Sequence, residues 1–165
     1  MSTNLTPTVR SVFRGPLGAM TLAAQGATLV GVWFDGQKHQ PDPSTWPWAP
    51  ESPVLTAAAA QLEAYFAGTL KKFSLPLNLG GGTAFQQSVW RQLLATPHGQ
   101  TVSYGAIAKA LGRPDASRAV GAAVGRNPIS IVVPCHRVVG AGGALTGYAG
   151  GLDRKTALLQ LESTV

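Results

Sequence analysis

The single cysteine of the chain, Cys135, lies in Pro134-Cys135-His136-Arg137, where residue types suited to nucleophilic chemistry are adjacent. A thiolate is a strong nucleophile, nearby positive charge favours it over the thiol, and a histidine can accept its proton. The alternative is a buried structural thiol, because free cysteine is often a core residue. Neighbouring side chains of an extended strand face opposite sides, so His136 reaches the sulfur only if the chain turns there or through a water molecule.

Glu162 is a second candidate because it ends the apolar run Leu158-Leu159-Gln160-Leu161. A carboxylate near a helix C-terminus is disfavoured by the helix dipole, so we expect a tertiary partner, and a histidine would serve. Solvent exposure near the chain end is the alternative. His39 and His98 lie in turn sequences without the paired spacing of metal ligands. We therefore predict neither a metal site nor a cofactor.

One cysteine excludes an internal disulfide and is typical of a reducing, intracellular compartment, so we predict a cytoplasmic protein. The uncharged run 15–34 is interrupted by Pro16 and by glycines, which argues against a membrane span or a signal peptide. Hydrophobic residues make up 45% and charged residues 12%, a balance that excludes a disordered chain.

Positive charge is concentrated in the second half of the chain. Residues 1–82 carry five basic and four acidic side chains, whereas residues 83–165 carry eight and three. Such an excess indicates a polyanionic partner, most commonly nucleic acid, although a merely basic protein has the same balance. The basic residues that carry the excess are Arg91, Lys109, Arg113, Arg118, Arg126 and Arg137.

The first half of the chain reads as a small sheet followed by one helix. Short apolar and alternating runs over 9–34 predict strands, and five prolines within 35–53 predict a loop. Ser52-Pro53 supplies an N-cap and a first-turn proline for a helix that Gly68 closes, and residues 75–79 are expected to return as a strand. The buried face of that helix should hold Leu55, Ala59, Leu62 and Phe66.

The second half reads as mostly helical. Thr83 and Gln86 have capping-box spacing for a helix that ends before Pro97. Ser103 caps a short helix to residue 111, and Asp115 is expected to cap another to about residue 124; the pair has helix-turn-helix dimensions. The second of these helices is thin, being rich in alanine and glycine, which suits close approach to a surface. An ordinary helical hairpin is the alternative.

We expect the rest of this half to contain an extended apolar segment at 129–133, a glycine-rich loop at 140–151 and a last helix capped by Asp153. The predicted fold class is α+β: a small N-terminal antiparallel sheet with a helix, then a mostly helical lobe containing a helix-turn-helix. We divide the chain into an N-terminal scaffold lobe, 1–80, and a C-terminal, mostly helical lobe, 83–165, with glycines 80–82 as the hinge.

Taken together, the motifs of residues 83–162 resemble the O6-alkylguanine-DNA alkyltransferase family. The matching segments are Phe85-Gln86 with Val89-Trp90, Ser103-Tyr104-Gly105, Arg118-Ala119-Val120-Gly121, Asn127-Pro128, the run IVVPCHRVV at 131–139, Gly147-Tyr148, Gly150-Gly151-Leu152 and Glu162. The resemblance implies DNA repair by irreversible, stoichiometric transfer of the alkyl group of O6-alkylguanine to Cys135. O4-alkylthymine is left open as a second substrate.

The resemblance also implies a role for each matching residue. His136 would help to deprotonate Cys135 through water, Glu162 would orient His136, and Asn127 would brace the turn. The base would be flipped out of a duplex bound through its minor groove. The residues implied in binding the base or the DNA are Tyr104, Arg118, Val138, Tyr148 and Ala149, with Arg118 filling the vacated stack and the backbone of Val138 and Ala149 reading the base. Arg113 is expected to contact DNA phosphate because it is a basic residue that borders the thin helix.

The partner implied is double-stranded DNA, bound by a monomer without a membrane association. Ala149 stands where some relatives carry serine, which leaves the preferred alkyl size open. The zinc site that some relatives build from cysteines should be absent, because the chain has no second cysteine. Two other functions remain open at this point: a DNA-damage-binding module in which Cys135 is not alkylated, and a thiol hydrolase.

Overall fold

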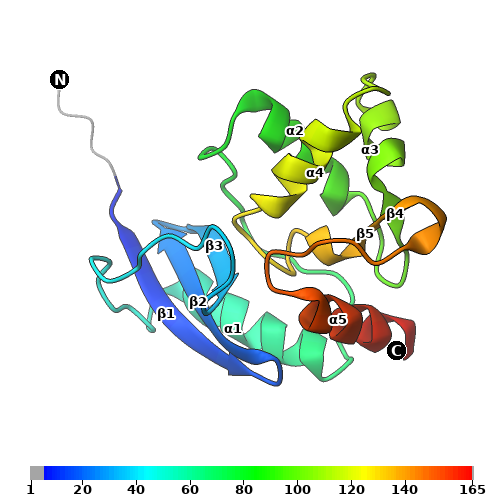
Figure 1. Cartoon of the computed structure of the whole chain (residues 1–165). Helices are drawn as coiled ribbons and strands as arrows, with labels where there is room; N and C mark the ends of the chain where they lie inside the picture. Colours follow the sequence, from blue (N-terminus) through cyan, green and yellow to red (C-terminus); the bar gives the residue numbers. More distant parts are fainter. Residues whose placement is uncertain (1–5, 165) are drawn as a thin grey trace, which may run out of the picture.

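The computed structural model of the chain describes residues 6–164, which form two lobes that pack against each other (Figure 1). The N-terminal lobe contains an antiparallel sheet of β1 (Thr8–Gly15), β2 (Gly18–Gln25) and β3 (Thr28–Phe34), in that order. Tight turns join the strands, and Gly26 adopts a φ of +58° in the second turn, a conformation that glycine adopts at little cost. The predicted small N-terminal sheet is confirmed.

Helix α1 (Pro53–Phe66) covers one face of this sheet (Figure 1). Its first-turn proline and the closing Gly68, with a φ of +80°, agree with the prediction. Ser52 stands at the N-cap but makes no side-chain cap bond, so that part of the expectation is wrong. The buried face of α1 holds Val54, Leu55, Ala58, Leu62 and Tyr65, whereas Ala59 and Phe66 are half-buried.

The predicted strand at 75–79 is not formed. Only Leu77 makes a β-bridge, to Leu29. Pro76 lacks the N–H that a continuous ladder would need at its position, which explains why pairing does not extend.

The C-terminal lobe is mostly helical. Helix α2 (Ala84–Leu94) begins at the predicted capping box, in which Thr83 and Gln86 exchange both bonds. Helices α3 (Tyr104–Ala110) and α4 (Ser117–Gly125) form the expected helix-turn-helix, with Gly112 at a φ of +72° in the turn. The predicted cap by Asp115 is wrong, because Ala116 occupies the N-cap without a side-chain bond.

A pair of short strands, a 3₁₀ turn and a last helix complete this lobe. The strands β4 (Val102–Ser103) and β5 (Val138–Val139) pair in parallel, and the loop after β5 includes a short 3₁₀ turn, η2 (Ala141–Gly143). Helix α5 (Leu152–Thr164) begins one residue before Asp153, which therefore lies in the first turn rather than at the cap. A negative charge there still complements the helix dipole.

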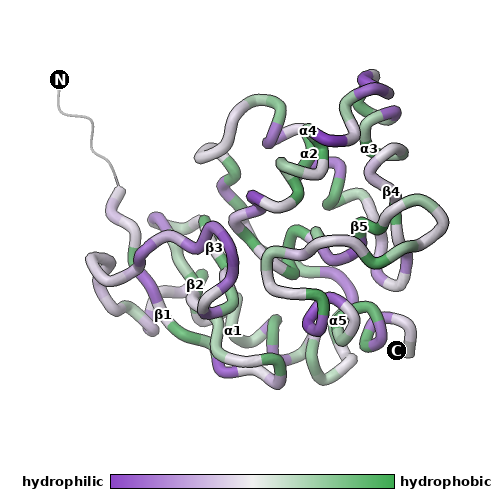
Figure 2. Tube along the Cα trace, in the orientation of Figure 1, coloured by the Kyte–Doolittle hydropathy of each residue, from purple (hydrophilic) through white to green (hydrophobic). Residues whose placement is uncertain are grey.

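The two lobes share one apolar core. Backbone bonds join them directly, because the Val32 N–H donates to the Pro128 carbonyl at 2.9 Å and the Ser130 N–H donates to the Val32 carbonyl at 3.0 Å. Figure 2 shows hydrophobic residues along the strands and inner helices, and hydrophilic ones at outer turns such as that between α3 and α4. Within residues 6–164, every helix is too short or too polar to cross a lipid bilayer. The α+β class is confirmed.

Candidate active site

The segment before Cys135 is a tight turn, not the extended run that its apolar composition suggested. Ile131 has a φ of +70°, and Ser130 forms a bridge with Val133. A β-branched residue is strained at positive φ, so the surroundings must hold the turn in place.

Asn127 holds this turn from inside. Its side-chain Nδ2 donates to the Val133 carbonyl at 2.7 Å, and its Oδ1 accepts from the Ile129 N–H at 3.0 Å. The side chain is buried, so these bonds replace water for two backbone groups that would otherwise be unpaired. The structure therefore gives Asn127 the bracing contacts that a turn of this shape needs.

After the turn, Cys135 and His136 lie in a 3₁₀ turn, η1 (Cys135–Arg137). The alternating geometry of an extended strand, which would point the two side chains to opposite sides, does not apply here. Cys135 is 4% exposed and His136 is fully buried.

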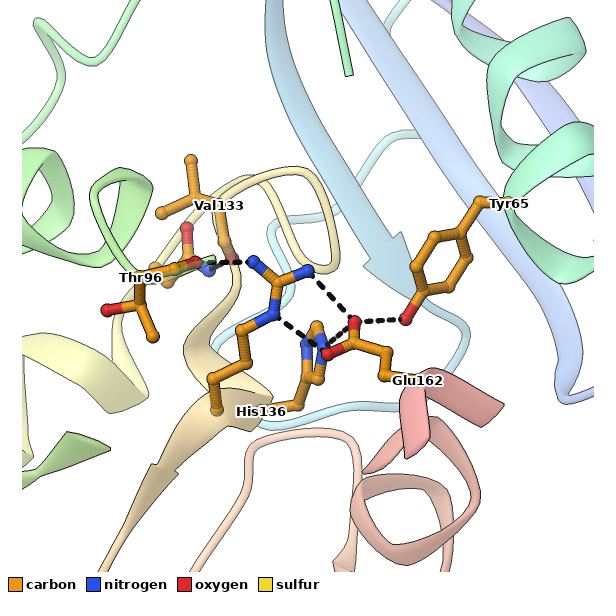
Figure 3. Close-up of polar contacts among 7 residues, drawn as sticks. Tyr65, Thr96, Val133, His136 and Glu162 are labelled. Carbon is orange, nitrogen blue, oxygen red and sulfur yellow. Dashed lines mark hydrogen bonds and ion pairs between the residues drawn. The ribbon is translucent and has the colours of Figure 1, made fainter. Parts of the chain in front are cut away.

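The buried carboxylate of Glu162, on α5, is the centre of a hydrogen-bond network (Figure 3). His136 Nε2 lies 2.6 Å from Glu162 Oε2, which confirms the expected tertiary contact between a histidine and this carboxylate. Arg137 donates twice, from Nε to Oε1 at 2.8 Å and from Nη2 to Oε2 at 3.0 Å. The Tyr65 hydroxyl, from α1, donates to Oε2 at 2.6 Å.

These contacts fix the charges of the site. Burial raises the pKa of Glu162, but the hydrogen bonds of His136 and Arg137 outweigh it and hold the pKa well below its usual range. Burial lowers the pKa of His136 against the opposing effect of Glu162, so the imidazole is neutral at neutral pH. Because Nε2 faces a carboxylate, the proton of the neutral ring is on Nε2. Nδ1, buried and without a hydrogen-bond partner within residues 6–164, is then the basic nitrogen.

The groups around Cys135 have opposite effects on the pKa of its thiol. Burial raises its pKa, whereas hydrogen bonding by Asn127 and the positive charge of Lys155 lower it. The ammonium group of Lys155, itself buried, donates to the carbonyls of Val138, Thr146 and Gly147, and so fastens the glycine-rich loop to β5. The thiol is thus kept mostly protonated, with a base nearby.

A cavity of about 400 Å³ opens between α4 and the glycine-rich loop. Tyr104, Tyr148 and Ala149 line it together with the small residues of α4, so three of the predicted binding residues come together here. The buried Tyr148 hydroxyl makes no hydrogen bond within the described part of the chain, and it lies close enough to Cys135 for the two groups to shift each other's pKa. Tyr148 therefore connects the cavity with the thiol.

The remaining predicted residues lie outside this cavity. Arg118 is exposed in the first turn of α4, and Arg113 is exposed with its guanidinium 5.5 Å from the centre of the Phe85 ring. Val138 is buried in β5, where its carbonyl accepts from Lys155. No group of three or more histidine, cysteine, aspartate or glutamate side chains between residues 6 and 164 is arranged to hold a metal ion.

Sequence reasoning missed two residues of the site and misjudged a third. Tyr65 and Lys155 carried no local signal, because their partners are far away in the chain or are backbone carbonyls. Arg137 was expected only to add positive field near the thiol, yet it binds Glu162 with two nitrogens and the Thr96 carbonyl with a third. A basic residue directly after His136 was the one available signal for that contact.

Comparison with known proteins supplies two family matches. Residues 8–79 match "6-O-methylguanine DNA methyltransferase, ribonuclease-like domain", and residues 84–164 match "6-O-methylguanine DNA methyltransferase, DNA binding domain". A methylated-DNA–protein-cysteine methyltransferase of Mycobacterium tuberculosis is 51% identical over 90% of this chain and 88% of its own. One of Methanosarcina acetivorans is 50% identical over 93% and 97%. The crystal structure of Mycobacterium tuberculosis OGT in complex with DNA superposes with a TM-score of 0.87 at 48% identity, over 93% of this chain and 91% of that one.

Proposed function

The chain belongs to the 6-O-methylguanine DNA methyltransferase family and is a DNA-repair enzyme that transfers an alkyl group from DNA to a protein cysteine, and we propose that Cys135 is the acceptor and O6-alkylguanine the substrate. The observation that carries the assignment is the contact of His136 Nε2 with Glu162, which leaves Nδ1 as a buried base next in sequence to the only cysteine.

The proposed reaction begins with proton transfer from Cys135, through water, to Nδ1 of His136. Glu162 stabilises the imidazolium that forms, in the manner of a catalytic triad. The thiolate then attacks the alkyl carbon, so that an S–C bond forms while the C–O6 bond breaks and its electron pair goes to the guanine. The guanine takes up a proton, which restores the normal base. The thioether has no route back to a thiol, so each protein molecule reacts once.

The cavity beside α4 is the proposed site for the base. Its volume of about 400 Å³ suits a flipped nucleobase, and the substrate carbon is out of reach while the base is stacked in a duplex. Tyr104 lines the cavity and would hydrogen-bond the base, and the backbone of Ala149 would read its edge. Thr146, which donates to the Tyr104 hydroxyl at 3.1 Å, supports that orientation. Val138 does not line the cavity and its carbonyl already accepts from Lys155, so its contact with the base is proposed only through the second lone pair of that carbonyl.

Binding to DNA is proposed to use the helix-turn-helix. The small residues of α4 allow close approach to the minor groove, where readout is degenerate and therefore suits a protein that must act in any sequence. Arg118, exposed at the start of α4, would fill the space left by the flipped base, while Arg113 would contact phosphate. We propose that the protein binds as a monomer and acts in the reducing cytoplasm, where the thiol stays free.

We further propose that the two lobes have different roles: residues 1–80 form the scaffold, and residues 83–165 form the DNA-binding and alkyl-acceptor lobe. Residues 1–5 and 165 of these ranges lie outside the part of the chain that the structure describes.

The decisive experiment is mass spectrometry of the intact protein and its peptides after incubation with a duplex that contains one O6-methylguanine. We expect one added methyl group per protein, on the peptide that contains Cys135, and none in the Cys135→Ser variant. Binding to the duplex without any mass gain would mean that the chain only recognises damage. Repeated turnover of a small ester would instead indicate a hydrolase.

A further inference from the structure

The N-terminal lobe contributes a polar group to the hydrogen-bond network around Glu162. The Tyr65 hydroxyl, near the end of α1, donates to Glu162 Oε2 at 2.6 Å (Figure 3). This is the same oxygen that faces His136 Nε2 at 2.6 Å. The Tyr65 hydroxyl and the His136 ring are therefore connected through a single oxygen atom, Glu162 Oε2, although Tyr65 comes from the other lobe.

The Tyr65 ring is held on several sides. Its centroid lies 5.4 Å from that of Phe66, 5.5 Å from that of Phe73 and 6.2 Å from that of His98. The side chain is 1% exposed, and α1 fixes its backbone. With the ring so confined, the hydroxyl is directed at the carboxylate.

The direction of this hydrogen bond is also fixed. Burial, followed by the negative charge of Glu162, raises the pKa of Tyr65 far above its usual range, so the phenol stays protonated. Since the Glu162 carboxylate can only accept, the tyrosine donates throughout the pH range in which the alkyl transfer would be measured.

We infer that Tyr65 is a positioning residue for alkyl transfer: its hydroxyl orients the Glu162 carboxylate against His136 and takes up part of the negative charge that the imidazole would otherwise feel. This inference rests on the proposed function. It gives the N-terminal lobe a part in the chemistry as well as in the scaffold. Tyr65 itself does not touch the reacting atoms and acts through Glu162.

Other charged and titratable groups lie close to His136 and Glu162, and a variant that tests Tyr65 must leave them unchanged. Arg137 and Lys155 place positive charge near His136, and the His98 ring lies edge-on to the Tyr65 ring. None of these side chains is altered by a change at position 65 that keeps the ring.

The test is the pH profile of alkylation in the full-length Tyr65→Phe variant, with free O6-benzylguanine as the probe. Without the hydroxyl, Oε2 presents more negative charge to His136, which stabilises the imidazolium and raises the pKa of the ring. Protonated His136 cannot accept the thiol proton, so the second-order rate constant falls in acid. In the variant, this acidic limb of the pH profile should lie about one pH unit higher than in wild type.

A second variant keeps the inference testable if Tyr65→Phe does not fold. Fluorotyrosine at position 65 keeps the size of the side chain nearly unchanged and makes the hydroxyl a stronger donor. The acidic limb should then move to lower pH, the opposite direction. The matched control is Thr21→Val, which removes another buried hydroxyl of the N-terminal lobe, bonded to Asp35 rather than to Glu162, and should leave the limb in place.

An acidic limb that stays at the wild-type pH in both Tyr65 variants would overturn the inference, even if the rate falls, because a packing defect alone does not move the limb. Shifts in the two opposite directions would support it. The wild-type protein separates this result from the proposed function: absence of alkylation at Cys135 in wild type refutes the function, whereas normal wild-type alkylation with unshifted variants refutes only the role of Tyr65.

Discussion

Replacing Glu162 with glutamine should destabilise the protein strongly, because this side chain joins both lobes. Its two carboxylate oxygens accept bonds from His136, Arg137 and Tyr65. Glutamine has nearly the same shape, but one of the two oxygens becomes an NH₂ group that can only donate. At least one of the present donors then faces another donor.

The expected size of the effect follows from the buried ion pair. Both Glu162 and Arg137 are at most 6% exposed, and removal of one partner of such a pair costs about 3–5 kcal/mol. For a chain of this length that corresponds to a loss of roughly 6–20 °C in Tm. The loss is a large part of a total stability of about 5–15 kcal/mol.

The effect should also depend on pH. The pKa of Glu162 is lower in the folded protein than the value of about 4.3 that an unfolded chain has, so its contribution is present above that pH and is lost as the pH falls below it. The glutamine variant has no such group. The difference in unfolding free energy between wild type and variant should therefore be largest near neutral pH and should shrink in acid.

Urea unfolding followed by tryptophan fluorescence, repeated from pH 7 down to pH 3, measures this difference. The control is Glu63→Gln, which makes the same chemical change at an exposed position of α1 and should alter stability by less than about 0.5 kcal/mol. Equal stabilities for the two variants at pH 7, or a gap that does not narrow in acid, would refute the reasoning.

Three other substitutions test separate parts of the site. Asn127→Ala should lower the unfolding free energy by about 2–4 kcal/mol, measured by thermal unfolding, because two buried backbone groups of the tight turn lose their partners. Arg118→Ala should slow repair of duplex DNA at least about tenfold, while the reaction with free O6-benzylguanine is unchanged. Arg91→Ala is the control. Equal losses of rate on both substrates would count against base displacement by Arg118. Lys155→Met should raise the pKa of Cys135, seen as a shift of the ultraviolet thiolate absorbance to higher pH, because a nearby positive charge is removed.

The sequence was most informative where local chemistry decides the structure. The capping box of Thr83 and Gln86 located the start of α2, and Gly112 located the turn of the helix-turn-helix. The motif around Cys135 led to the family, which the comparisons then confirmed. These signals act over three or four residues, so they are present in the sequence itself.

The expectations that failed depended on distant contacts. Apolar residues at 129–133 predict an extended run, but Asn127 folds them into a turn in which Ile131 takes a positive φ. No sequence pattern near Tyr65 indicates its hydrogen bond to Glu162, which lies 97 residues away. Single-sequence patterns do not contain such pairings.

The burial of Cys135 also bears on how long an unused protein molecule survives. With the sulfur 4% exposed and its pKa raised by burial, peroxides and small electrophiles in solution meet little accessible thiolate. Under the proposed single-use reaction, the protein would otherwise be consumed by such encounters before it found a lesion. The same burial that makes the thiol a poor general nucleophile would thus preserve the pool of active molecules until the proposed substrate base reaches it.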